Sequence, residues 1–90
     1  MHTAKHLRIV GLVQGVFFRA EMKKRADLLG VTGWVRNTDD DAVDAFIEGD
    51  EEAVQDLIVW CRAGPPMAHV DTVDVTDAAM EEQEGFTIVQ

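Results

Sequence analysis

Residues 11–19, Gly-Leu-Val-Gln-Gly-Val-Phe-Phe-Arg, combine residue types that together can bind an anion. Glycine allows backbone conformations in which consecutive N–H groups converge on one point. The stretch leads into a helical pattern, and a helix N-terminus adds unpaired N–H donors and positive potential. Arg19 then supplies a planar guanidinium that matches a phosphate or a carboxylate. These residues predict an anion-binding loop.

The loop alone does not identify its ligand, because a structural turn between a strand and a helix can use the same residues. It matches neither the Gly-x-Gly-x-x-Gly fingerprint nor the Gly-x-x-x-x-Gly-Lys-[Ser/Thr] phosphate loop, so it does not indicate a dinucleotide or ATP. Asn37 ends another apolar segment, where asparagine commonly forms a turn. A functional site at either place therefore depends on a fold that brings the two together.

Hydrophobic periodicity predicts five strands and two helices. The strands are expected near residues 5–12, 32–37, 42–48, 68–76 and 85–89, and the helices near 19–29 and between Asp50 and Gly64. The stretch 77–84 is expected to be an exposed connection. This order predicts a single α+β domain over residues 1–90, a ferredoxin-like split βαβ sandwich (βαββαβ plus a short C-terminal strand) with two helices on one face of an antiparallel sheet.

This topology predicts that the anion loop and Asn37 are neighbours. The first and second strands are expected to be parallel, with the third strand between them, so their C-terminal ends reach the same edge of the sheet. Two strand spacings then separate those ends, or about 10 Å. We therefore expect Arg19 and Asn37 to lie close together although they are far apart in the sequence.

The composition of the chain indicates which classes of ligand it can bind and in which cellular compartment it is expected. The chain carries 17 acidic and 8 basic residues, a net charge of −9, so the molecule as a whole repels nucleic acids and acidic membranes. No apolar run is long enough to span a membrane, and the N-terminus lacks an apolar signal-peptide core. The single cysteine, Cys61, cannot form an internal disulfide. We expect a cytoplasmic monomer that binds neither nucleic acid nor membrane.

Other residues with reactive side chains receive structural interpretations. His2, His6 and His69 lack the spacing of metal ligands to one another and to Cys61, so we expect no metal site. Cys61 lies on the apolar stripe of the second helical pattern and is expected to pack in the core.

The sequence resembles the acylphosphatase family. The resemblance rests on residues 11–19, on Gly-Trp-Val-Arg-Asn at 33–37, on Val43 and Gly49, and on the closing Gly-Phe-Thr-Ile at 85–88. It covers essentially the whole chain, and the paired motifs at this spacing are highly specific. It implies hydrolysis of a small-molecule acyl phosphate to a carboxylate and inorganic phosphate, without a metal, another cofactor or a covalent intermediate.

The resemblance also implies roles for individual residues. On the family pattern, Arg19 binds the phosphoryl group together with loop amides, and Asn37 positions the attacking water. The substrate-binding positions that the motif carries over are Gln14, Gly15, Val16, Phe17 and Phe18. Such roles suit a loose phosphoryl-transfer transition state, in which positioning and electrostatic stabilisation supply most of the catalysis.

The sequence departs from the family pattern at Asp41, where a glycine is expected four positions after the asparagine. Aspartate tolerates left-handed backbone conformations, so we expect the turn to survive. Asp39, Asp40 and Asp41 also place three carboxylates just beyond Asn37. We expect them to repel an anionic substrate, so that binding tightens as salt rises.

Three further interpretations stay open at this point. The same fold serves non-catalytic modules that bind small ligands or RNA, although an RNA-binding surface would be basic. The chain could also be an accessory domain of a larger protein, but the absence of a flanking linker favours a stand-alone acylphosphatase. Finally, the acidic surface suits either a high-salt cytoplasm or an ordinary acidic protein.

Overall fold

A computed structural model of the protein describes residues 1–89. The elements are β1 (His2–Leu12), α1 (Phe18–Leu29), β2 (Thr32–Asn37), β3 (Val43–Asp50), α2 (Glu51–Ala63), β4 (His69–Asp77) and β5 (Phe86–Val89). Every predicted element is present and in the predicted order. The largest difference in bounds is at β1, which begins at His2 because its first residues pair with the end of β3.

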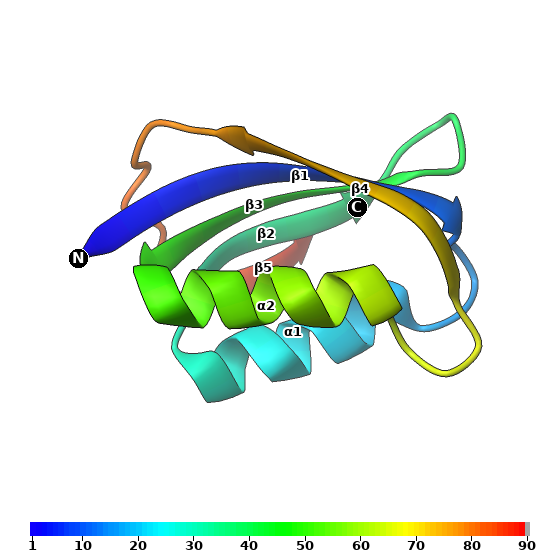
Figure 1. The fold of residues 1–90 in the computed structure, drawn as a ribbon, viewed down its shortest axis with the longest axis horizontal. Coiled ribbons are helices and arrows are strands. Elements are labelled where there is room, and N and C mark those ends of the chain that lie inside the picture. The colour runs from blue at the N-terminus through cyan, green and yellow to red at the C-terminus, as the bar shows by residue number, and fades with distance from the viewer. Residues whose placement is uncertain (90) are drawn as a thin grey trace.

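The strands form one sheet in the order β4-β1-β3-β2-β5, and both helices cover the same face (Figure 1). The pairs β1–β4, β1–β3 and β2–β3 are antiparallel, as predicted. β5 departs from that pattern because it runs parallel to β2. Since β3 is antiparallel to both β1 and β2, these two strands are parallel to each other. The predicted α+β sandwich is confirmed.

The core lies between the sheet and the helices, because alternate strand residues point to opposite faces of the sheet. Leu7, Ile9, Val35, Val43 and Ile47 are fully buried on the helix-covered face. They pack against the apolar stripes of the helices, formed by Phe18, Met22 and Ala26 in α1 and by Val54, Leu57, Ile58 and Cys61 in α2. The prediction that Cys61 packs in the core is confirmed.

The opposite face is partly covered near the start of β1. Alternation on β3 predicts that Glu48 faces solvent, but this prediction is wrong, since only 4% of Glu48 is exposed. Its carboxylate accepts hydrogen bonds from the backbone N–H groups of Glu81 and Glu82 at 3.0 and 3.1 Å and of Gln83 at 3.0 Å. The connection between β4 and β5 is thus folded around one buried side chain.

Three connections meet at one end of the sheet. Residues 13–17, the hairpin 38–42 and the turn 64–68 lie at the same end of the molecule, opposite the connection between β4 and β5 (Figure 1). The register explains this placement, because Ile9 of β1 and Asn37 of β2 both pair with Val43 of β3. The predicted convergence of the first and second strands at one edge is therefore confirmed.

Candidate active site

The loop before α1 takes its shape from an irregularity at the end of β1. The register between β1 and β4 shifts between Val10 and Gly11, and such a bulge bends a strand. Gly11 has φ 139°, and a Cβ there would lie 2.2 Å from the carbonyl oxygen of His69, so only glycine fits. After the bulge, β1 pairs with β4 for two more residues, Gly11 and Leu12, before the loop begins.

The loop itself presents free backbone donors. Gly15 and Phe17 have φ of 74° and 65°, and left-handed residues in a turn make the concave N–H arrangements that bind anions. The N–H groups of residues 15–17 make no hydrogen bond within residues 1–89. Phe17 caps α1 without a side-chain hydrogen bond, and the first N–H groups of a helix have no partner within it. These donors at the start of α1 can be satisfied by an anion.

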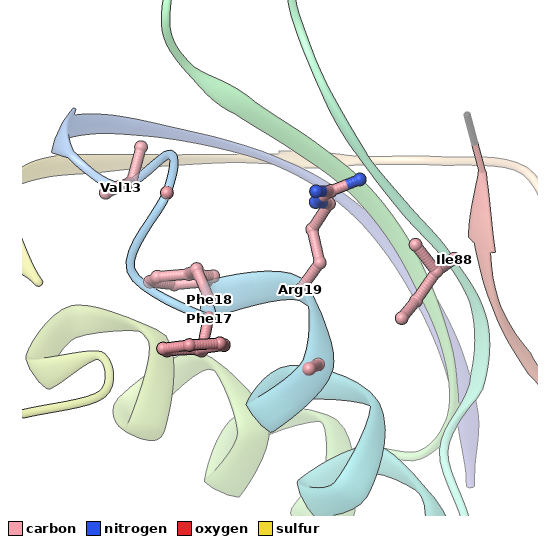
Figure 2. Close-up of a pocket in the computed structure, with 7 residues that line it drawn as sticks. Val13, Phe17, Phe18, Arg19 and Ile88 are labelled. Carbon is pink, nitrogen blue, oxygen red and sulfur yellow. The ribbon is translucent and has the colours of Figure 1, made fainter.

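Arg19 lies in the first turn of α1 and faces a pocket of about 380 Å³. Figure 2 shows its side chain rising from the helix toward the strands, between the loop and Ile88 of β5. Within residues 1–89, its guanidinium forms no ion pair and no hydrogen bond. The pocket is lined by Val13, Gly15, Phe17, Phe18, Arg19, Ala20 and Ile88. It therefore combines an unpaired cation with free amide donors.

Gln14 joins this loop to the strand end that carries Asn37. Its Nε2 donates one hydrogen bond to the carbonyl oxygen of Thr38 and one to that of Ala42, both at 2.8 Å. These two acceptors are the two ends of the β2–β3 turn, whose closure also includes a bond from the Thr38 N–H to the Ala42 carbonyl at 2.9 Å. The loop and the hairpin are thus fixed to each other by one side chain.

Asn37 does not line the Arg19 pocket, but its strand pairs with a residue that does. Asn37 lies on the same sheet face as Val35, which pairs with the pocket residue Ile88 of β5. The side-chain Oδ1 of Asn37 is buried and accepts no hydrogen bond from residues 1–89. An amide exchanges its oxygen and nitrogen by a half-turn, so this side chain can offer an acceptor or a donor to a water molecule.

The hairpin beyond Asn37 is stabilised by its own side chains. Asp41 has φ 71°, so aspartate does occupy the left-handed position, as predicted. The Thr38 hydroxyl accepts a hydrogen bond from the Ala42 N–H at 3.0 Å. The same hydroxyl, together with the guanidinium of Arg8, holds the pKa of the Asp40 carboxyl below its ordinary value. One of the three hairpin carboxylates is therefore already neutralised by a cation on β1.

The structure separates the predicted substrate-binding residues by their exposure. Phe17 is 72% exposed, whereas Phe18 is 1% exposed and packs against Trp60 with ring centroids 5.4 Å apart. Phe18 can therefore offer an anion only its backbone N–H group. The side chain of Gln14 has no proton left to donate to an anion, because both protons of its Nε2 are donated to the hairpin. Gly15 and Val16 have backbone N–H groups without a partner in residues 1–89.

Sequence reasoning missed two contributors to this end of the molecule. Ile88 lines the pocket because β5 pairs with β2, and alternation of Phe86 and Ile88 against Thr87 was the signal for an inward-facing Ile88. Thr38 shapes the turn through its hydroxyl, and its position next to Asn37 in a run of turn-forming residues was the available signal.

Other reactive side chains do not form a second cluster. Among residues 1–89, no group of three or more His, Cys, Asp or Glu is placed to hold a metal ion. Burial raises the pKa of the Cys61 thiol to about 12, so the thiol stays protonated near neutral pH. In the described part of the chain, neither helix has the length and apolar character needed to cross a bilayer.

The chain is similar in sequence and in fold to known proteins over nearly its whole length. The acylphosphatase family model matches residues 5–88. An acylphosphatase of Thermococcus kodakarensis is 54% identical over 84 residues, which cover 93% of this chain and 92% of that protein. One of Thiobacillus denitrificans is 50% identical over 81 residues, 90% of each chain. The crystal structure of the Bacillus subtilis acylphosphatase superposes with a TM-score of 0.95 at 34% identity, covering 100% of both chains. This chain belongs to the acylphosphatase family.

Proposed function

We propose that the chain hydrolyses acyl phosphates by direct attack of water on phosphorus, with the phosphoryl group held by Arg19 and the amides of residues 15–19. The observation that supports this most strongly is the pocket itself, which combines an unpaired guanidinium with free N–H donors. A phosphoryl group carries charge on several oxygens, and this pocket offers donors to them from more than one direction.

Asn37 orients the attacking water in this mechanism. It cannot remove a proton near neutral pH, but the reaction does not need a strong base, because a carboxylate leaves without being protonated and a loose transition state needs little nucleophilic push. The water oxygen bonds to phosphorus while the bond between phosphorus and the acyl oxygen breaks. The electron pair of that bond leaves with the carboxylate, and both protons of the water remain on the phosphate.

Gln14 acts in this proposal as a positioning residue rather than as a ligand of the phosphoryl group. Its two bonds to the hairpin fix the distance between the loop that holds phosphate and the strand end that holds water. Reactants held in a near-attack geometry gain much of their rate from that placement.

We also propose that the active species is a monomer, because one chain supplies the loop, Arg19 and Asn37. Light scattering of the active enzyme tests this proposal.

The first test is hydrolysis of acetyl phosphate and benzoyl phosphate by wild type and by Arg19→Ala and Asn37→Ala. Removing an oriented donor from such a site costs about 10²–10³ in rate, so we expect kcat/KM to fall at least that far in each variant. Arg25→Ala is the matched control, since Arg25 is an exposed arginine on the same helix. Either site variant keeping near-wild-type turnover while folded would overturn the assigned role.

The same assay tests the metal-free mechanism. We expect activity to be unchanged after treatment with EDTA, and inorganic phosphate to raise the Tm of wild type but not of Arg19→Ala. Loss of activity on chelation, restored by a divalent cation, would contradict the mechanism.

We also propose a cytoplasmic location, supported by the lone buried Cys61; cell fractionation with an antibody tests it.

A further inference from the structure

A second, apolar groove borders the phosphate pocket. It has a volume of about 250 Å³ and is lined by Val16, Phe17, Glu21, Pro65, Pro66 and Met67; we call it the acyl groove. Phe17 lines both this groove and the Arg19 pocket, so the two hollows share one side chain as a wall. The residues that line it come from the loop and first turn of α1 and from the turn between α2 and β4.

Phe17 has a conformation that packing does not explain. Its φ of 65° is unfavourable for a bulky side chain and costs about 1–3 kcal/mol, a cost that occurs most often at ligand-binding sites. Phe17 as a whole residue is 72% exposed, so burial within the chain does not offset this cost, although the same backbone conformation also shapes the anion loop. An apolar ring held in this position is stabilised when a ligand covers it.

Met67 forms the other exposed wall of the groove. It is 70% exposed, although the turn that carries it is rigid. Pro65 and Pro66 have fixed φ angles, and the Ala68 N–H closes the turn by donating to the Pro65 carbonyl at 2.9 Å. Two large apolar side chains thus face a shared groove from separate, fixed segments. Because these walls already have a fixed conformation, a ligand that binds between them causes little loss of conformational entropy in the protein.

The volume and charge of the groove indicate what it binds. At about 250 Å³ it holds several water-sized groups but is smaller than the pockets of roughly 300–1,000 Å³ that take whole ligands, so it fits one part of a ligand. The single charged residue that lines it is Glu21, whose carboxylate is paired with the Nζ of Lys24 at 3.4 Å. Because the other walls are apolar and cannot replace the hydration of a charge, the groove favours an uncharged apolar group and disfavours one with a carboxylate or a second phosphate.

We propose that the acyl group of the substrate binds in the acyl groove while its phosphoryl group occupies the Arg19 pocket, so that the enzyme prefers acyl phosphates with aromatic or other uncharged apolar acyl groups. This inference rests on the proposed function of the Arg19 pocket. Because the groove and the Arg19 pocket share Phe17, a group attached to a phosphate in that pocket is the occupant that the geometry favours, rather than a segment of another protein.

The test compares kcat/KM for benzoyl phosphate and acetyl phosphate in wild type and in Met67→Ser. We expect wild type to prefer benzoyl phosphate, and Met67→Ser to lower the benzoyl-to-acetyl ratio by about five- to tenfold, because apolar contact with the larger group is lost. Met67→Leu should keep the ratio. The matched control is Met80→Ser, at the opposite end of the sheet, which should leave both values unchanged.

A second comparison tests the role of charge. Succinyl phosphate, with its free carboxylate, should be a poorer substrate than butyryl phosphate of the same chain length, and Glu21→Gln should narrow that difference. If wild type hydrolyses neither acetyl nor benzoyl phosphate, the proposed function fails and the inference fails with it. If both are hydrolysed but Met67→Ser leaves the ratio unchanged, the proposed role of the acyl groove is refuted while the proposed function stands.

Discussion

At the scale of residues, the hairpin beside the site depends on a left-handed aspartate. Asp41 has φ 71° in the turn whose two ends, Thr38 and Ala42, accept hydrogen bonds from Gln14. Its carboxylate forms no ion pair within residues 1–89, unlike that of Asp40, which pairs with Arg8. Asp41 therefore adds negative charge near an anion site, at a position where glycine could adopt the same backbone conformation.

Asp41→Gly should improve substrate binding at low salt. Glycine adopts the left-handed conformation freely, so we expect the change in unfolding free energy to be below about 1 kcal/mol. In wild type, KM for acetyl phosphate should fall as KCl rises, because salt screens the repulsion between hairpin and substrate. In Asp41→Gly, KM should start lower and depend less on salt.

The control for this prediction is Asp56→Asn, which removes an exposed carboxylate in the middle of α2. It should leave KM and its salt dependence unchanged. A wild-type KM that climbs steadily with added KCl would contradict the prediction.

The sequence predicted the chemistry of residues better than their contacts. Arg19 and Asn37 could be proposed as site residues because a guanidinium suits phosphate, because the family motif carries both residues, and because topology places their segments at one edge of the sheet. The two bonds of Gln14 could not be found, because they depend on the path of a hairpin that no local pattern specifies. Helical spacing with Met22 and Ala26 did predict that Phe18 is buried, and the structure confirms it.

At the scale of elements, the least regular segment of the chain is fixed by a single carboxylate. Three backbone N–H groups of the connection between β4 and β5 donate to the buried Glu48 of β3. Strand alternation predicted the strands themselves, since it depends on local sequence. It could not predict the burial of Glu48, which arises only when a distant connection folds over the end of β3.

Glu48→Gln should destabilise the fold without changing catalysis. The amide keeps one acceptor oxygen and turns an NH₂ group toward N–H donors, so at least one buried donor loses its partner, at a cost of about 1–3 kcal/mol. We expect a lower urea midpoint and Tm. The value of kcat should not change, because Glu48 lies at the opposite end of the sheet from Arg19 (Figure 1). Glu84→Gln, an exposed acid in the same connection, is the control, and equal stability of both variants would refute this role.

At the scale of the whole molecule, the charge of −9 opposes folding through self-repulsion. Exposed ion pairs such as Lys23–Asp27 and Lys24–Glu21 involve only some of the carboxylates. We propose that the acidic surface is an adaptation to high salt. Screening worth about 1 kcal/mol would raise Tm by about 4–8 °C for a domain of this size.

Thermal unfolding in low KCl and in molar KCl tests this proposal. We expect Tm to rise with salt, with most of the gain at concentrations where the Debye length falls below about 8 Å. A Tm that is the same at both concentrations would show that the surface charges do not limit stability, and the high-salt interpretation would fail.

The parallel pairing of β5 has a practical consequence for attaching this enzyme to other objects. Val89 lies opposite Arg36, the neighbour of Asn37, whereas His2 lies opposite Asp50 at the other end of the sheet. A bead, an electrode or a fused protein joined before β1 would leave the catalytic pocket open to solution. The same cargo joined behind β5 would begin beside the pocket and obstruct the approach of substrate.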